Sequence, residues 1–354
     1  MDHIEVKAPA RVTIGGEHSV VYGGPSLSAA IGLFASAKMS DSGNGKLEIV
    51  LQDLGVSKNL DAAELEQLYA DYSTRDTANP QGIADYVSKN AQNVGSKVLP
   101  YATIAARLFG GHKLNPIGAR VEIHSEVPPQ KGFASSAICS AAFAMALIRA
   151  SGMMLDDQTI IDIIRDGERI VHRAETAGRI DVGPVYFGGF ARFSAAEGVK
   201  KEDISAPLNL VVIDTGPKPP TAEMVGRVRE RYNKDRDGTI KIMRNIDACV
   251  EKEIAALKIG NIQELGKEMS RNHALLKELG VSSEGLDRAV SIAAENGAYG
   301  AKLCGGGGGG MAVALVDDAS AETVVKSLKA NGFEAYVTSI EPKGAKDSKI
   351  SYDG

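Results

Sequence analysis

Two carboxylates in the middle of the chain are of the residue type that phosphoryl transfer uses. Glu168 falls in a segment with helical character, and Asp181 follows 13 residues later in the glycine-containing stretch Gly178–Pro184. Phosphoryl transfer needs oxygen ligands for magnesium and a carboxylate that orients or deprotonates the attacking hydroxyl. One acid on a helix and one on a loop can fill these roles, although each residue taken alone resembles a solvated surface acid.

The beginning of the chain places three further polar side chains together. Arg11, Glu17 and His18 fall within eight residues, where a strand-like segment breaks at a pair of glycines. The combination predicts a polar pocket for a small polyol or carboxylate. A polar turn after an edge strand is the other interpretation of Glu17 and His18.

Residues 127–137 join a predicted strand to an alanine-rich helix and have the composition of an anion site. Ser135 and Ser136 stand where an N-cap belongs, and a helix N-terminus offers free N–H groups and the positive end of a dipole. Gly132 would let the backbone wrap closely, and Lys131 adds charge. An ordinary capped helix accounts for the segment equally well. No G-x-x-x-x-G-K-[ST] sequence occurs, which excludes the standard phosphate loop.

Six consecutive glycines, Gly305–Gly310, interrupt apolar sequence near the end of the chain. A flexible linker is one interpretation. The apolar flanks instead favour a backbone that passes close to another backbone or to a phosphate. A strand-like segment follows the run, whereas a dinucleotide site would continue into a helix.

These residues need a framework of strands and helices, and hydrophobic periodicity predicts one. The pattern of the second half, a strand, several helices, a strand, a helix and a last strand, predicts an α+β domain, with a boundary near residues 194–206. The predicted strands are 46–51, 120–127, 190–193, 208–213, 311–316 and 334–340. The predicted helices are 136–150, 160–172, 221–232, 240–257, 262–279, 284–295 and 321–330.

Composition restricts the partners of the protein. The 354 residues carry a net charge of −5 without a basic tract, which argues against a nucleic-acid partner. Three widely separated cysteines favour a reducing compartment. The acidic N-terminus lacks the features of a signal peptide, and the most apolar stretch, 137–148, is shorter than the ~20 residues of a membrane span. We therefore expect a cytoplasmic protein without a membrane partner.

Three segments, in this order along the chain, resemble the three motifs of the GHMP kinase family. They are Ala8–Gly24, Pro128–Ala137 and Lys302–Gly310. The resemblance implies an α+β fold of two domains, a ribosomal-protein-like α/β domain at 1–200 and a ferredoxin-like domain at 201–354. Segments Glu17–Gly23, Ile213–Gly216 and Asn272–Val281 are similar to those family members, especially archaeal ones, that phosphorylate mevalonate.

The resemblance also implies a role for each candidate residue. A loop would hold the phosphates of ATP, and the glycine run would contact the bound nucleotide. The residues implied are Lys131, Gly132, Phe133, Ala134, Ser135, Ser136, Gly306, Gly307 and Gly308. Bulky replacements at Gly306–Gly308 are expected to affect ATP use more than folding.

The remaining implied roles concern the metal and the acceptor. Ser136 and Glu168 would bind Mg²⁺, and Asp181 would orient or deprotonate the substrate hydroxyl. Arg11 would sit beside Asp181, and Glu17 and His18 would face mevalonate; the family often forms homodimers. Because an arginine cannot release its proton, any catalytic role of Arg11 is electrostatic.

Several residues depart from the family pattern. The loop is unusual at Gln130, Phe133, Ala134 and Ile138, and Ala134 replaces a glycine without strain only where no positive φ is needed. Arg11 stands where mevalonate-specific members carry lysine. A kinase for another alcohol or sugar is one alternative, although Val20 and Val21 suit a branched acid better than a sugar. A catalytically silent ATP-binding sensor is the other.

Overall fold

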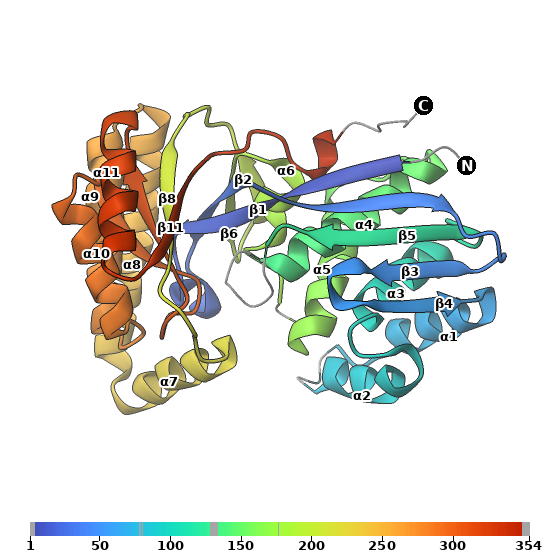
Figure 1. Cartoon of the computed structure of the whole chain (residues 1–354). Helices are drawn as coiled ribbons and strands as arrows, with labels where there is room; N and C mark the ends of the chain where they lie inside the picture. Colours follow the sequence, from blue (N-terminus) through green and yellow to red (C-terminus); the bar gives the residue numbers. More distant parts are fainter. Residues whose placement is uncertain (1–3, 78, 80, 128–133, 176, 349–354) are drawn as a thin grey trace.

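The computed structural model describes residues 4–77, 79, 81–127, 134–175 and 177–348. The loop residues Lys131, Gly132 and Phe133 lie outside the described residues. Within them, two sheets, each with its own helices, lie side by side along the molecule (Figure 1).

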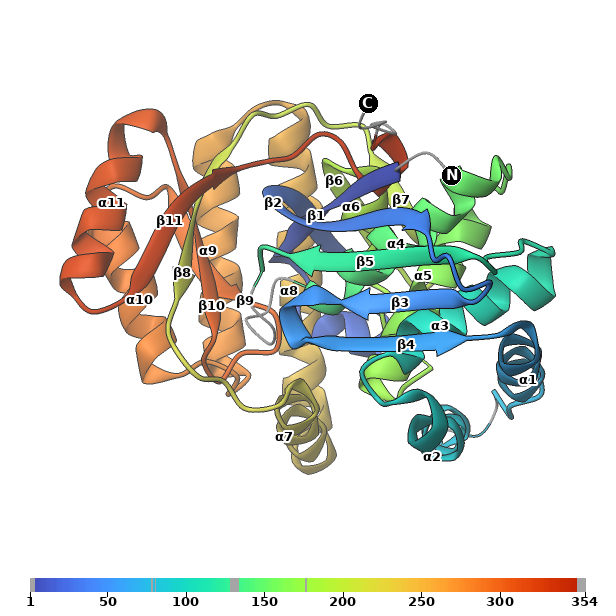
Figure 2. The ribbon, with the colours of Figure 1, turned by 45° about the vertical axis from the view of Figure 1, so that its right-hand side comes forward.

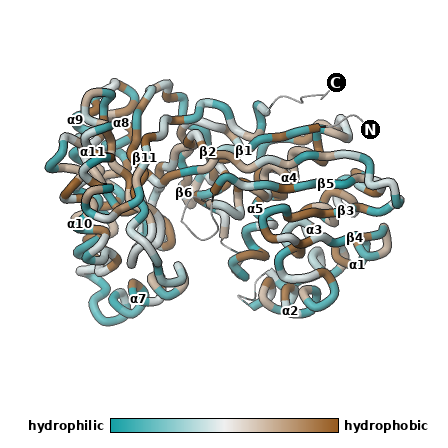
Figure 3. Tube along the Cα trace, in the orientation of Figure 1, coloured by the Kyte–Doolittle hydropathy of each residue, from teal (hydrophilic) through white to brown (hydrophobic). Residues whose placement is uncertain are grey.

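The first sheet is built on two long antiparallel strands, β1 (Ile4–Gly15) and β2 (Ser26–Asp41). The other edge of β2 pairs with two successive neighbours, β5 (Ala119–Ser125) along its second half and β6 (Phe190–Ser194) along its first. Apolar and polar residues alternate along β5, so that one face meets the core and the other does not (Figure 3). The sheet is completed by β3 (Leu47–Leu51), β4 (Val56–Leu60) and β7 (Gly198–Glu202), in the order β4-β3-β5-β2-β6-β7.

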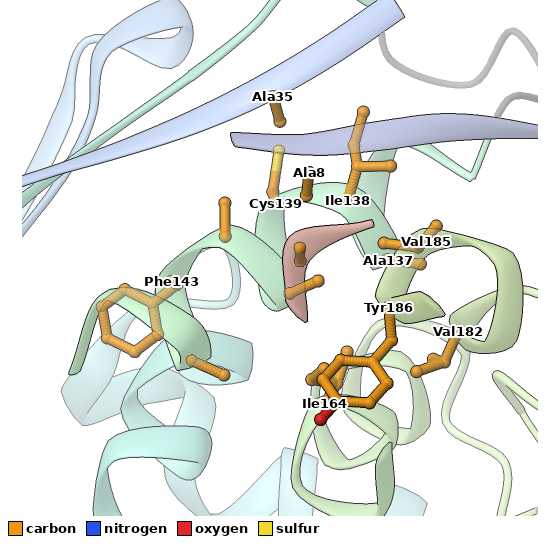
Figure 4. Close-up of a cluster of buried hydrophobic side chains, with 14 of the residues drawn as sticks. Ala8, Ala35, Ala137, Ile138, Cys139, Phe143, Ile164, Val182, Val185 and Tyr186 are labelled. Atoms are coloured by element: carbon orange, nitrogen blue, oxygen red, sulfur yellow. The ribbon is translucent and has the colours of Figure 1, made fainter. Parts of the chain in front are cut away.

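Helices pack behind this sheet, and α4 (Ser135–Ser151) is the central one. Residues 137–148 are all buried, because alanines let α4 approach β1 and β2 closely while longer side chains fill the gaps. Figure 4 shows Ala137, Ile138 and Cys139 between the strands and the helix that carries Val182 and Tyr186. The other helices of this half are α1 (Ala62–Ser73), α2 (Gly82–Val94), α3 (Leu99–Ala106), α5 (Asp157–His172) and α6 (Val182–Phe187).

The second sheet is antiparallel and has the strand order β11-β8-β10-β9. This order, with helices against one face, confirms the predicted ferredoxin-like arrangement (Figure 2). Its strands are β8 (Asn209–Asp214), β9 (Gly300–Cys304), β10 (Met311–Val316) and β11 (Glu334–Ser339). Its helices are α7 (Thr221–Lys234), α8 (Arg236–Lys258), α9 (Ile262–Glu278), α10 (Glu284–Glu295) and α11 (Asp318–Ala330).

The two halves share apolar packing. Val313 of β10 belongs to the large core that includes β1, while its neighbour Ala312 belongs to the core under the C-terminal helices. Both faces of β10 are thus buried, which explains why it appears in the sequence as a continuous apolar run. No helix of the described part is long and apolar enough to cross a membrane.

The chain crosses between the halves twice. The first sheet ends with β7 at Glu202 and the second begins at Asn209, so we propose residues 203–208 as the boundary. The predicted division at 200 and 201 would fall within β7. The last segment then returns to the N-terminal half: Ile340 bridges to Ile31, and the backbone N–H of Lys7 donates to Ser348 Oγ over 2.9 Å. Sequence reasoning missed this return.

Candidate active site

Arg11 and Asp181 form the centre of the site. Arg11 lies on β1 and is buried, while Asp181 directly precedes α6. Arg11 donates to Asp181 Oδ1 from Nε over 2.8 Å and also from Nη2, and its Nη1 donates to Thr13 Oγ1 over 2.7 Å. Burial lowers the pKa of Arg11, but the charge of Asp181 and its hydrogen bond to Arg11, with a contribution from Glu17, outweigh burial, so the pKa is raised overall. The structure therefore confirms the neighbourhood expected for Arg11 and Asp181.

The turn after β1 forms a second ion pair, with a partner the sequence did not suggest. Lys302 of β9 donates from Nζ to Glu17 Oε1 and to the Leu303 carbonyl over 2.8 Å. Both charged side chains are almost wholly buried. The second oxygen of Glu17 has no hydrogen-bond partner among the described residues. Glu17 thus links the two halves, and its expected contact with the substrate stays a prediction.

His18 connects the same turn to the glycine run. Its Nε2 lies 3.0 Å from the carbonyl oxygen of Gly306. A carbonyl only accepts, so Nε2 carries the proton. Burial lowers the pKa of His18, with the Gly306 carbonyl and Glu17 opposing the shift, which favours the neutral ring. This hydrogen bond therefore ties Gly306 to the turn that follows β1.

Part of the glycine run is required by the packing of its own domain. At Gly307, where φ is +80°, a Cβ would lie 2.0 Å from the carbonyl oxygen of Val281. That carbonyl accepts a hydrogen bond from the Gly308 N–H over 2.8 Å. The run is therefore a tightly packed loop, and the linker interpretation is wrong. A side chain at Gly307 would collide with backbone, so a replacement there also costs stability; whether ATP use is affected more than folding stays a prediction.

The N-terminus of α4 has a cap that differs from the expected one. The N-cap residue is Ala134, and Ser135 and Ser136 begin the helix without a side-chain capping bond. Ala134 has a φ of 59°, the left-handed conformation that costs a residue with a Cβ ~1–2 kcal/mol. The condition under which Ala134 would replace glycine without strain is therefore not met. The first-turn N–H groups of α4 have no intrahelical acceptors and remain suited to an anion.

Glu168 of α5 has the environment of a cation ligand. It is buried, its Oε2 lies 3.5 Å from His172 Nε2, and its Oε1 has no partner in the part of the chain that the structure describes. The bond to Glu168 is the main reason why the pKa of His172 is raised. An orphaned carboxylate oxygen fits Mg²⁺, which takes one or two protein oxygens and completes its shell with phosphates and water. Glu168 therefore fits a carboxylate ligand of the metal, and the expected contribution of Ser136 stays a prediction.

The chain belongs to the GHMP kinase family. Residues 100–189 match the sequence profile of the GHMP kinases N terminal domain, and residues 254–334 match that of the GHMP kinases C terminal region.

Within that family, the chain is similar to several proteins named mevalonate kinase. The mevalonate kinases of Thermococcus sibiricus and Pyrococcus horikoshii are each 30% identical to this chain, over 97% and 99% of it and 98% and 99% of their own lengths. The mevalonate kinase of Mus musculus is 27% identical over 96% of the chain and 93% of its own length.

Solved structures have the same fold. A mevalonate kinase crystal structure superposes with a TM-score of 0.78 at 23% identity, covering 95% of this chain and 99% of that one. A structure of L. major mevalonate kinase in complex with R-mevalonate superposes with a TM-score of 0.73 at 23% identity, over 96% of each chain.

Proposed function

We propose that this protein transfers the γ-phosphoryl group of ATP to mevalonate, giving 5-phosphomevalonate and ADP. The observation that carries the proposal is the Arg11–Asp181 ion pair, held where β1, α6 and the glycine loop approach one another. Relatives support the proposal, because two proteins that match nearly the whole chain at 30% identity are both named mevalonate kinase. Those names do not favour a sugar kinase or a silent sensor.

Asp181 receives the proton of the attacking hydroxyl in this proposal. Two N–H groups of Arg11 fix one of its carboxylate oxygens, so the other oxygen is left to the substrate. A positioned carboxylate of this kind contributes roughly 10²–10⁴ to a rate. Arg11 keeps its proton throughout and stabilises negative charge that develops beside it.

The phosphates of ATP bind at the beginning of α4. The free N–H groups of Ser135 and Ser136 face an anion there, and Lys131, Gly132, Phe133 and Ala134 complete the loop. Ser136 and Glu168 hold Mg²⁺, which when bound neutralises phosphate charge. Gly306, Gly307 and Gly308 form the wall on the nucleotide side, and Glu17 and His18 form the wall on the acceptor side.

A panel of acceptors tests the substrate directly. Purified protein with ATP and Mg²⁺ is given mevalonate, galactose, homoserine or phosphomevalonate, and ADP release is followed. We expect mevalonate to give a kcat/KM at least ~100-fold above every other acceptor, since a site built for one set of polar groups rejects analogues lacking them. Turnover with another alcohol and none with mevalonate would overturn the proposal.

We also propose a cytoplasmic location and a homodimer. The location is supported by the three cysteines Cys139, Cys249 and Cys304, which are free and buried in the structure. The homodimer is supported by the family resemblance alone, and light scattering coupled to size-exclusion chromatography measures it.

A further inference from the structure

Lys218 is a cationic residue of the C-terminal half that the proposed mechanism leaves unused. It lies between β8 and α7 in the sequence Pro217-Lys218-Pro219-Pro220. Each proline fixes its own φ and restricts the residue before it. The backbone that carries Lys218 is therefore held in one extended conformation.

The stem of Lys218 lies against the end of the glycine run. A Cβ at Gly310 would be 2.9 Å from Lys218 Cδ and 3.3 Å from its Cβ, so a larger residue there would make the Lys218 side chain shift. The Gly310 carbonyl also accepts from the backbone N–H and the hydroxyl of Thr215, over 2.7 and 2.8 Å. The glycine run and the proline segment thus form one packed unit that sets the direction of Lys218.

This unit adjoins the Arg11–Asp181 pair. Gly310 precedes Met311, which pairs with Cys304 across β10 and β9. The thiol of Cys304 accepts from the Thr13 N–H over 3.2 Å, and Thr13 Oγ1 accepts from Arg11. A short series of contacts therefore connects the segment that carries Lys218 to Arg11.

The positive charge of Lys218 is not neutralised by an ion pair with any residue that the structure describes. Burial lowers its pKa, Arg11 lowers it further, and Cys304 and Asp181 raise it. Among the residues that the structure describes, its ammonium group makes no hydrogen bond and no ion pair within 4 Å. Asp181 is already engaged by two N–H groups of Arg11. Arg11 and Lys218 are thus two positive charges near a single carboxylate, and this excess of positive charge favours the binding of an anion.

The position of Lys218 also indicates which anion binds beside it. The charge of Lys218 acts on Asp181 and also on His172, which lies 3.5 Å from Glu168. Asp181 is the proposed base, and Glu168 is the proposed magnesium ligand. A phosphoryl group in transfer passes between the base that holds the acceptor and the metal that holds the nucleotide.

We propose that Lys218 binds the γ-phosphoryl oxygens of ATP during transfer, as a cation supplied by the C-terminal half. The inference rests on the proposed kinase function and adds a residue to its machinery. A fixed cation acts where charge develops on the transferring group, so its loss lowers kcat more than it weakens mevalonate binding.

Cysteine substitution followed by chemical restoration of the charge tests the proposal. We expect Lys218→Cys to lower kcat roughly 100-fold while KM for mevalonate stays within about 3-fold. Treatment with 2-bromoethylamine joins the thiolate sulfur to an aminoethyl group with loss of bromide and restores an ammonium at nearly the same distance. We expect the treated variant to recover at least roughly 10-fold in kcat. The three native cysteines are buried and should not react, which mass spectrometry checks.

Two matched variants complete the design. Lys234→Cys, at an exposed lysine on the end of α7, should match the wild type before and after treatment. Lys218→Arg keeps the charge and should retain more kcat than Lys218→Met.

Three outcomes would overturn the proposal. They are a wild-type kcat in Lys218→Cys, complete modification without recovery, and an effect confined to KM for mevalonate. The variants and the wild type are compared with whichever acceptor the wild type phosphorylates. If it phosphorylates none, ATP hydrolysis, in which water is the acceptor, is compared instead. A failed substrate assignment is therefore told apart from a failed role of Lys218.

Discussion

At the scale of single residues, buried charge is concentrated around the end of β1. Arg11 and Asp181 face the proposed reaction, whereas Glu17 and Lys302 lie behind it with almost no exposure. A buried ion pair costs desolvation of both groups, so it persists where it fixes a geometry. Here the Lys302–Glu17 pair fixes the turn that carries Glu17 and His18, the wall proposed to meet the acceptor, and the Arg11–Asp181 pair joins β1 to the residue before α6.

A third buried acid beside this turn predicts a pH dependence of stability. Glu253 of α8 lies against Gly15, where a Cβ would be 2.0 Å from Glu253 Oε2. Burial raises its pKa from 4.5 to about 8; Glu17 adds to the shift and Lys302 opposes it. Below pH 4.5 the carboxyl is neutral in both the folded and the unfolded state. Between pH 4.5 and about 8 only the unfolded state ionises freely, so the free energy of unfolding falls as pH rises.

We therefore expect the wild-type Tm to fall between pH 5 and pH 9 by more than that of Glu253→Gln, which cannot ionise. Thermal unfolding followed by circular dichroism measures both. Glu251→Gln, at an exposed acid two residues away on α8 whose partner Arg192 is also partly exposed, is the control and should keep the wild-type slope. Identical slopes for Glu253→Gln and the wild type would contradict the account.

At the scale of elements, the glycine run behaves as a folded loop whose positions differ in what they tolerate. Gly305 and Gly307 both have positive φ values, of 88° and 80°. A Cβ at Gly305 meets nothing within 4 Å, whereas one at Gly307 would meet the Val281 carbonyl at 2.0 Å. The two positions share the backbone conformation and differ only in the space around it.

Alanine substitutions at these two positions separate strain from collision. Gly305→Ala should cost ~1–2 kcal/mol of unfolding free energy, the price of a left-handed alanine. Gly307→Ala should cost at least about 2 kcal/mol more, since a backbone hydrogen bond and its surroundings must move. Urea denaturation measures both. Equal losses would show that the contact with Val281 does not constrain the loop.

The elements that the sequence predicts are those whose signals are local. Helices α8, α9 and α10 carry periodic apolar residues and side-chain N-caps, and β8 and β10 are short apolar runs between breakers. β2 was missed because it is rich in alanine and serine, which have little strand preference, and it is held by pairing along both edges. β9 was missed because it is short and contains Lys302.

The same reasoning explains which parts of the site could be predicted. Arg11, Glu168 and Asp181 stand in segments whose local composition is distinctive, so the sequence indicates them and the resemblance orders them. The partner of Glu17 lies 285 residues away, and no local pattern connects the two. The positive φ of Ala134 was also beyond prediction, because alanine ordinarily signals a right-handed conformation.

At the scale of the whole molecule, the two halves are joined by charge as well as by apolar packing. The Lys302–Glu17 pair crosses from β9 to the turn after β1, and the last segment of the chain returns to the first sheet. Removing one partner of a buried pair leaves an uncompensated charge in the interior. We therefore expect Lys302→Met to lower the free energy of unfolding by ~3–5 kcal/mol.

A second substitution shows whether that loss comes from the stranded charge. Lys302→Met combined with Glu17→Gln should regain at least about 1 kcal/mol, because the amide is neutral. Chemical denaturation measures both variants. A single variant as stable as the wild type, or a double variant no better than the single one, would contradict this view of the interface.

The central claim is that Asp181, held by Arg11, carries phosphoryl transfer to mevalonate. The most direct measurement compares the wild type with Asp181→Asn at saturating ATP, Mg²⁺ and mevalonate, with 5-phosphomevalonate and ADP quantified together and ATP binding measured by calorimetry. The account predicts one phosphomevalonate per ADP in the wild type. It predicts a rate at least ~100-fold lower in Asp181→Asn, with ATP binding nearly unchanged. Full activity in Asp181→Asn, or ADP without phosphomevalonate in the wild type, would contradict it.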